Sequence, residues 1–81
     1  MKVRVKLFAV AKELAGSDIL VIELSEGATV ADLRQAVVNV VPALAKIVPH
    51  SLWAVGAEYA ADDVKLVGDT EIALIPPVSG G

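Results

Sequence analysis

The residues best suited to chemistry stand at the end of the chain, in the stretch PPVSGG. Gly80 and Gly81 have no Cβ, so their backbone can thread a narrow channel and the terminal carbonyl carbon is open to attack. Pro76 and Pro77 hold the backbone extended and block strand pairing beyond them, which projects the tail away from the body of the protein. The pattern predicts a carboxylate, that of Gly81, delivered into the active site of another protein. The residues expected to thread into that partner are Pro76, Pro77, Val78, Ser79 and Gly80.

Other side chains with catalytic or ligand-binding potential lack partners in the sequence. His50 is the only histidine and there is no cysteine, which leaves no Cys/His metal cluster, disulfide or thiolate chemistry on this chain. Asp62 and Asp63, with Glu58 nearby, lack the spacing of a calcium-binding loop and are interpreted as a solvated loop pair. No G-x-x-x-x-G-K-[ST] phosphate-binding loop is present. We therefore expect no bound metal or cofactor, and no ATP binding by the chain alone.

Length and charge narrow the class of protein further. With 81 residues, 56% of them hydrophobic, the chain is long enough for one domain with a dense core. The longest stretches without a charged residue are 35–45 and 47–57, far short of the roughly 20 apolar residues that span a membrane. The net charge of −3 argues against nucleic acid as a partner. We expect a soluble, cytoplasmic protein with no membrane partner, and the absence of cysteine fits a reducing compartment.

The first third of the chain predicts two strands around a short helix. KVRVKLF, residues 2–8, alternates basic and apolar side chains, as a half-buried strand does. A short helix over about residues 10–14 should follow, with Gly16 placed to cap its C-terminal end. DILVIEL, residues 18–24, alternates again and predicts the second strand.

The clearest helix comes next. Thr29 is a natural N-cap, and Asp32 suits a capping box and the helix dipole. Apolar residues recur at helical spacing from Val30, and Pro42 ends the run. A further helical turn, a strand in SLWAV closed by Gly56, a loop-rich crossover and a final strand in EIALIP complete the order. The order predicts an α+β domain, in which one main helix packs on a mixed sheet and the last strand pairs beside the first.

Side-chain parity in these two strands predicts an exposed patch. Lys2, Arg4 and Lys6 share one face of the first strand, either for solubility or as a docking surface for an acidic partner. In the last strand Ile72 and Leu74 should face the helix. The residues that follow each of them in the sequence should therefore point outward. If the two strands are adjacent, the outward residues form an apolar patch with a charged rim, which is typical of a partner-binding surface. The predicted patch consists of Phe8, Ala73 and Ile75, rimmed by Arg4 and Lys6.

The stretch EIALIPPVSGG resembles the C-terminus of the molybdopterin synthase small-subunit family, ubiquitin-like sulfur carriers with the β-grasp fold. The resemblance covers essentially the whole chain. VKLFAVAKELAG resembles the family's opening strand and helix, TVADLRQAV its capped central helix, and WAVGAEYAADDVKL its middle strands. The resemblance implies a β-grasp domain over residues 1–76 and a flexible C-terminal tail over residues 77–81.

The resemblance also implies a function and its partners. In that family a separate E1-like activating enzyme uses ATP to adenylate the C-terminal glycine, which here is Gly81. Sulfur from a donor protein then converts this glycine to a thiocarboxylate, so that Gly81 carries AMP and afterwards sulfur. The tail enters the large subunit of a heterotetrameric synthase and donates sulfur to cyclic pyranopterin monophosphate in molybdenum cofactor biosynthesis. The chain would be a sulfur-carrying subunit and no enzyme on its own.

Three alternatives remain open at this stage. A sulfur carrier of the thiamine pathway shares the fold and the terminal Gly-Gly, although its tail approaches the glycines without prolines. A ubiquitin-like protein modifier would use the same adenylate to form isopeptide bonds with lysines. An inert binding module would have no use for its glycines.

Overall fold

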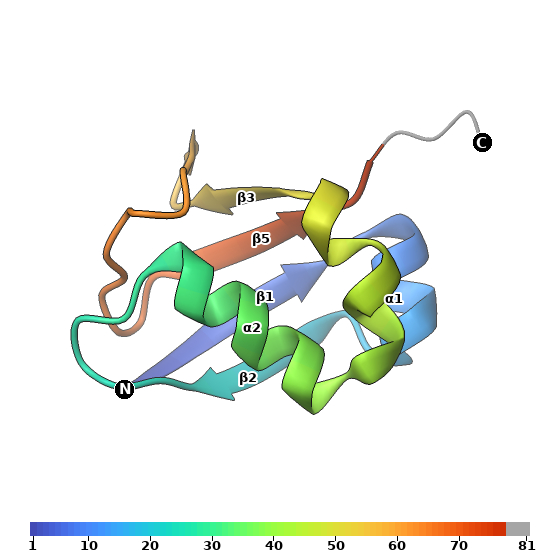
Figure 1. The fold of residues 1–81 in the computed structure, drawn as a ribbon, viewed down its shortest axis with the longest axis horizontal. Coiled ribbons are helices and arrows are strands. Elements are labelled where there is room, and N and C mark those ends of the chain that lie inside the picture. Colours follow the sequence, from blue (N-terminus) through green and yellow to red (C-terminus); the bar gives the residue numbers. More distant parts are fainter. Residues whose placement is uncertain (78–81) are drawn as a thin grey trace.

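The computed structural model of the protein describes residues 1–77 and shows a five-stranded sheet crossed by one long helix (Figure 1). Two shorter 3-10 helices and a short α-helix lie at one end of the sheet. The elements are β1 (Lys2–Leu7), α1 (Ala9–Ala15), β2 (Ile19–Glu23), α2 (Val30–Val40), η1 (Pro42–Lys46), η2 (Val48–His50), β3 (Leu52–Val55), β4 (Glu58–Tyr59) and β5 (Glu71–Ile75).

The sheet has the order β2-β1-β5-β3-β4, so the first and last strands form its central pair. β1 and β5 run parallel, from Arg4 opposite Glu71 to Leu7 opposite Leu74, while the other neighbours are antiparallel. The predicted mixed sheet, with its last strand beside its first, is confirmed. Because α2 lies on one face only, the other face of the sheet is free in the described part of the chain (Figure 1).

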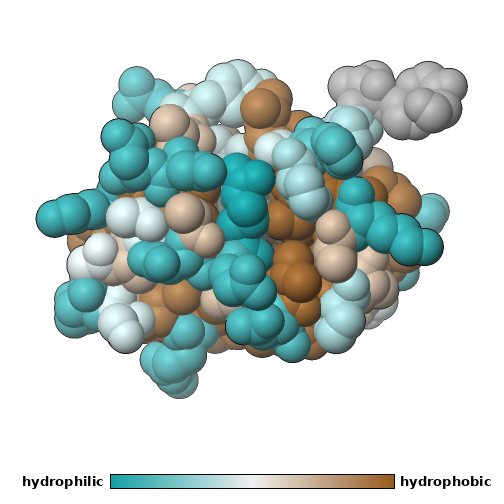
Figure 2. All heavy atoms as spheres, in the orientation of Figure 1, coloured by the Kyte–Doolittle hydropathy of each residue, from teal (hydrophilic) through white to brown (hydrophobic). Residues whose placement is uncertain are grey.

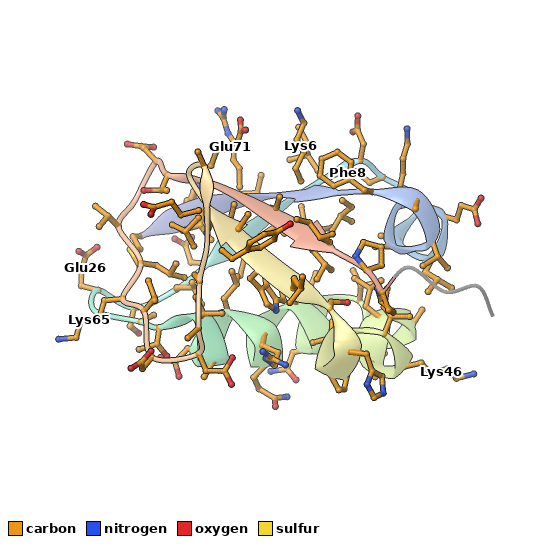
Figure 3. All side chains as sticks on the ribbon, turned by 90° about the horizontal axis from the view of Figure 1, so that it is seen from above. Lys6, Phe8, Glu26, Lys46, Lys65 and Glu71 are labelled. Atoms are coloured by element: carbon orange, nitrogen blue, oxygen red, sulfur yellow. The ribbon has the colours of Figure 1, made fainter. Side chains whose placement is uncertain are left out.

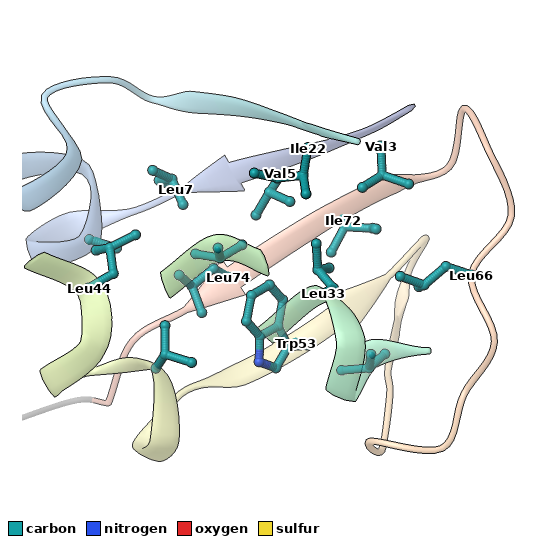
Figure 4. Close-up of a cluster of buried hydrophobic side chains, with 14 residues drawn as sticks. Val3, Val5, Leu7, Ile22, Leu33, Leu44, Trp53, Leu66, Ile72 and Leu74 are labelled. Atoms are coloured by element: carbon teal, nitrogen blue, oxygen red, sulfur yellow. The ribbon is translucent and has the colours of Figure 1, made fainter. Parts of the chain in front are cut away.

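The hydrophobic core fills the space between the sheet and α2 (Figure 4). β1 alternates between exposed and fully buried side chains, as its sequence predicts. Trp53 of β3, only 1% exposed, is the largest buried side chain, and its indole ring lies among the aliphatic residues of the core (Figure 4). Each such aliphatic side chain contributes roughly 1.5–3 kcal/mol when fully buried. The fully buried aliphatic residues of β1, α2 and β5 are Val3, Val5, Leu7, Val30, Leu33, Val37, Ile72 and Leu74.

A capping box fixes the first turn of α2, as the sequence predicts. The Thr29 backbone N–H donates to Oδ2 of Asp32 at 2.9 Å, and the Asp32 backbone N–H donates to the Thr29 hydroxyl at 3.4 Å. The two bonds satisfy amide groups that have no partner inside the helix. The carboxylate of Asp32 also lies at the positive end of the helix dipole.

Loss of this cap should destabilise the domain measurably. We expect Thr29→Ala to lower the free energy of unfolding by about 1 kcal/mol, because an amide of the first turn loses its acceptor. The midpoint of urea unfolding, followed by the fluorescence of buried Trp53, measures the change. Ser25→Ala in the same loop is the matched control, since the Ser25 side chain is exposed. Equal midpoints for the two variants would contradict a stabilising role for the cap.

The crossover between β4 and β5 is tied to the same end of α2. The backbone N–H of Val30 donates to the carbonyl of Val64, and that of Ala31 donates to the carbonyl of Asp62, both at 3.0 Å. The Asp62 carboxylate also forms a salt bridge with Arg34 on α2. These contacts position the long connection that leads into β5.

Two details differ from the sequence expectations. β4 is a strand of two residues, with Tyr59 opposite Ala54, inside the segment expected to be a loop-rich crossover. Of Val40 and Val41, which continue the apolar spacing of α2, Val41 is partly buried against the core while Val40 is 59% exposed. The short first helix is confirmed with bounds one residue wider at each end, and Gly16 caps it with a φ of 70°.

Candidate functional site

The candidate site is the face of the sheet that α2 leaves free. Figure 3 shows Lys6, Phe8 and Glu71 on the side of the sheet away from α2. Lys6 lies opposite Ala73 in the parallel pair. The register ends at Leu7 opposite Leu74. One further step along both strands would place Phe8 beside Ile75, where β5 ends. The sequence-predicted patch residues are therefore brought together at one end of the sheet.

Leu52 on β3 belongs to this surface and was not predicted. It lies opposite Ile75 in the antiparallel pair and is 55% exposed. Phe8 is 44% exposed, while Ala73 and Ile75 are partly buried. The alternation around Trp53 could have found Leu52, because a tryptophan facing the core turns its neighbours outward. We call Phe8, Leu52, Ala73 and Ile75 the outer patch.

Positive charge borders the outer patch on β1. Lys2, Arg4 and Lys6 are exposed on the same face, as their parity predicts. Glu71 is the strand neighbour of Arg4, but within residues 1–77 neither Arg4 nor Lys6 takes part in a salt bridge. Both cations therefore remain available to an acidic group on a partner, where such contacts speed association and set specificity.

A hollow of about 370 Å³ lies at the other end of the same face, where β1 and β5 begin. Its walls mix two cations with two carboxylates and contain no cysteine or histidine. It lies at the opposite end of the strands from Ile75, where β5 ends. The hollow is lined by Lys2, Arg4, Val21, Asp69, Thr70 and Glu71.

The root of the predicted tail lies directly beside the outer patch. Ile75 ends β5, Pro76 is buried and Pro77 is exposed. Figure 1 shows β5 ending at the side of the sheet where α1 and η2 lie. Val78, Ser79, Gly80 and Gly81 lie outside the described residues, so their predicted roles stay predictions.

The turn that follows Phe8 has an unusual backbone. Ala9, the first residue of α1, has a φ of 50°. This left-handed conformation costs a residue with a Cβ roughly 1–2 kcal/mol. Among residues 1–77 the others with positive φ are Gly16, Gly27, Gly56 and Asp69, types that tolerate it better.

The remaining polar residues that the sequence singles out are not gathered into a site. His50 is exposed in η2, and Asp62 is engaged by Arg34. Asp63 and Glu58 are exposed. Residues 1–77 contain no cluster of three or more histidine, cysteine or acidic side chains arranged to hold a metal ion, nor a helix long and apolar enough to cross a membrane.

The face that carries α2 differs from the outer patch in the hydropathy of its surface. In the view of Figure 2, hydrophilic side chains are spread across this face, with hydrophobic ones between them. Of the large apolar residues that are exposed, Phe8 and Leu52 lie on the sheet's free face, together with Ile19 and Val21 on β2.

Comparison with known proteins places the chain in a family. The ThiS family matches residues 5–81. The curated molybdopterin synthase sulfur carrier subunit of Chlamydomonas reinhardtii is 35% identical over 83 residues, covering 100% of both chains. The subunit of the same name from Dictyostelium discoideum is 37% identical, covering 96% of this chain and 94% of its own.

Solved structures agree on the fold. SAMP1 of Haloferax volcanii, a small archaeal modifier protein, superimposes with a TM-score of 0.89 at 34% identity, covering 100% of both chains. The mixed five-stranded sheet with its single long helix has the β-grasp, ubiquitin-like architecture. The α+β, β-grasp fold expected from the sequence is confirmed.

Proposed function

This chain belongs to the ThiS family, and we propose that it is the sulfur carrier subunit of a molybdopterin synthase. What carries the proposal is the end-to-end likeness to curated subunits of that name, at 35% and 37% identity. Their shared name also favours this pathway over the thiamine pathway. The chain would act as a co-substrate of the synthase, with the catalytic groups for transfer on the large subunit.

The proposed chemistry takes place at Gly81. A carboxylate is a poor electrophile at neutral pH, so its oxygen first attacks the α-phosphate of ATP on an E1-like activating enzyme and releases pyrophosphate. Sulfur at the sulfide level, supplied by a donor protein, then bonds to the carbonyl carbon of the acyl-adenylate, and AMP leaves. The product is a thiocarboxylate, whose sulfur is the nucleophile that attacks cyclic pyranopterin monophosphate. Water would then cleave the bond between this sulfur and the Gly81 carbonyl carbon, which leaves the sulfur on the substrate and restores the carboxylate.

The described surface supports delivery of this group to a partner. The outer patch is apolar, is bordered by Arg4 and Lys6 and lies beside the root of the tail. A partner that covers the patch would hold the chain while the tail enters its active site. Buried Pro76 would then fix the direction in which the tail leaves the sheet.

The proposal is tested by the mass of the C-terminal peptide. The purified chain is incubated with its activating enzyme, ATP and a sulfur source, and is then digested with trypsin. Because no lysine or arginine follows Lys65, the peptide of interest spans residues 66–81. This peptide excludes Met1, whose oxidation adds nearly the mass that distinguishes sulfur from oxygen. We expect the thiocarboxylate form, and an unaltered peptide in the presence of a demonstrably active enzyme would contradict the proposal.

A protein modifier is the second candidate function. The likeness to SAMP1, at 34% identity over the full length of both chains, favours it. The adenylate of Gly81 would then be attacked by a lysine amine, which forms an isopeptide bond as AMP leaves. Trypsin would leave residues 66–81, and not only Gly-Gly, on the modified lysine. Peptides with that branch in an extract of the source cells would support this activity.

A further inference from the structure

The outer side of β2 is open to pairing with a further strand in the described part of the chain. The sheet order leaves β2 and β4 at its two edges, and β4 has only two residues. Figure 1 shows β2 as the outermost strand on its side of the sheet. Its five residues include no proline or lysine, and its register with β1 runs without a bulge. Those are the devices that commonly prevent a strand from adding to an edge.

The hydrogen bonds between β1 and β2 show which residues of β2 face outward. The backbone N–H of Leu24 donates to the carbonyl of Met1, and that of Leu7 donates to the carbonyl of Asp18, both at 2.8 Å. Leu24 and Asp18 therefore face β1 at the two ends of the pair. Along an antiparallel strand, residues that face the neighbour alternate with residues that face away from it. The residues of β2 whose N–H and C=O groups point outward are Ile19, Val21 and Glu23.

A serine hydroxyl already occupies the outward groups of Ile19. The hydroxyl of Ser17 donates to the Ile19 carbonyl at 2.8 Å and accepts from the Ile19 N–H at 3.3 Å. Within residues 1–77, no hydrogen bond of this kind reaches the outward backbone groups of Val21 or Glu23. The open part of the edge is therefore these two residues.

Two copies of this edge match each other. If the β2 strands of two copies lie antiparallel with Ile22 opposite Ile22, Val21 of each copy lies opposite Glu23 of the other. Both residues face outward, so each such pair exchanges two N–H···O=C bonds and leaves none of these groups open. In this register Ile19 lies opposite Ser25, beyond the paired residues. The contact is symmetric, as in most homodimers.

The side chains on the core side of β2 agree with this register. Leu20 of one copy lies opposite Leu24 of the other, and both are apolar residues partly buried against their own core. Ile22, at the two-fold axis, is 1% exposed on the same side of the strand. The two cores would therefore become continuous across the contact, where opposed apolar side chains stabilise paired strands.

The charges on the free face agree as well. Val21, which is 60% exposed, lies beside Glu23 of the other copy. Within its own copy Glu23 pairs with Lys2, and Val21 pairs with Arg4. Each Glu23 therefore has Lys2 of its own copy on one side and, beyond Val21, Arg4 of the other copy. These cations offset the approach of the two carboxylates.

We propose that β2 pairs with β2 of a second copy of this chain, so that the two sheets form one continuous sheet in a weak dimer. Opposed residues of paired strands share a face, so both outer patches lie on the same side of the joined sheet. β1 separates the contact from Ala73, Ile75 and Leu52, which stay accessible on β5 and β3. The inference concerns the edge of the sheet and holds whether or not the chain carries sulfur.

The test uses two substitutions at one position. Val21→Pro removes the outward N–H that donates across the dimer, and the hydrogen bonds of β1 with β2 do not use that N–H. Val21→Thr is the matched control, because threonine keeps both the N–H and the β-branched shape. Trp53 fluorescence shows whether each variant is folded.

Two readouts on the isolated chain report the dimer and its place. Sedimentation equilibrium of the parent should give a dissociation constant on the order of 0.1–1 mM, as a few hydrogen bonds and apolar contacts support. Val21→Pro should raise that constant at least tenfold, and Val21→Thr should stay within about twofold. NMR reports amide exchange at about 20 μM and about 1 mM of the parent. The amides of Val21 and Glu23 should exchange at least about twofold more slowly at the higher concentration, while that of Ile19, bonded to Ser17, should not change.

Each of three results would overturn the inference. The parent could remain a monomer at about 1 mM, which would leave the edge to water or to another protein. It could dimerise without slower exchange at Val21 and Glu23, which would place the contact on another surface. A folded Val21→Pro variant could associate as tightly as the parent, and the outward N–H would then have no part in the contact.

Discussion

Deletion of Gly81 abolishes sulfur transfer and leaves the domain folded; this is the largest effect we expect from any single change. The activating enzyme must form its adenylate on the terminal carboxylate, and removal of Gly81 moves that carboxylate back along the tail onto Gly80. The reacting carbon would then stop one residue short, and a misplacement of even about 1 Å can cost a hundredfold in rate. Thiocarboxylate formation and conversion of cyclic pyranopterin monophosphate measure the loss.

The deletion should not change the stability of the folded domain. The core is formed by residues up to Leu74, and β5 ends at Ile75. The unfolding midpoint, followed by Trp53 fluorescence, should therefore equal that of the parent. One residue added after Gly81 should block transfer equally, because the glycine no longer carries the carboxylate. Ser79→Ala is the control, since it alters the tail and keeps Gly81 terminal. Full transfer by the shortened or extended chain would contradict the proposed carrier chemistry.

The double substitution Phe8→Ala and Ile75→Ala should weaken binding of the large subunit by about a hundredfold. Phe8 and Ile75 each follow the last pair of the β1–β5 register, Leu7 opposite Leu74. Truncation of an anchor that a partner buries typically costs about 2 kcal/mol or more. Titration calorimetry with the large subunit measures this change, and a second titration measures affinity for the activating enzyme. Thiocarboxylate formation at a saturating concentration of that enzyme should survive, because Gly81 is unaltered.

The control is a truncation of an exposed apolar side chain on the face of the sheet that α2 covers. Val40→Ala also truncates an exposed apolar side chain, but Val40 lies on α2, on the covered side of the sheet. We expect its affinity for both partners to match that of the parent. If the double variant at Phe8 and Ile75 bound both partners as tightly as the parent does, the outer patch would not be a docking surface.

The strands and the main helix could be predicted from the sequence because each carries a strong local signal. β1 alternates charged and apolar residues without exception, and Thr29 with Asp32 marks the start of α2. β4 could not be predicted, since two residues are too few to show a period. It exists because Tyr59 pairs with Ala54 across the turn at Gly56.

The candidate site was predictable in part, for a related reason. Phe8, Ala73 and Ile75 follow from parity and from the pairing of β1 with β5. The alternation around Trp53 could have turned Leu52 outward, but its place beside Ile75 depends on the register between β3 and β5, which the sequence alone does not fix. The turn at Ala9 has no sequence signal, because alanine favours the right-handed helix and adopts a positive φ only where the rest of the fold imposes it.

The central position of β5 has a consequence for biosynthesis. β1 is synthesised before the other strands of the sheet, but its partner on one side is the last of them. Until β5 has emerged, the pair of β1 with β2 and the pair of β3 with β4 have no strand to join them. Such pairings between distant segments form late and slowly. The domain should therefore fold as a unit only after β5 has emerged, so the outer patch forms only then.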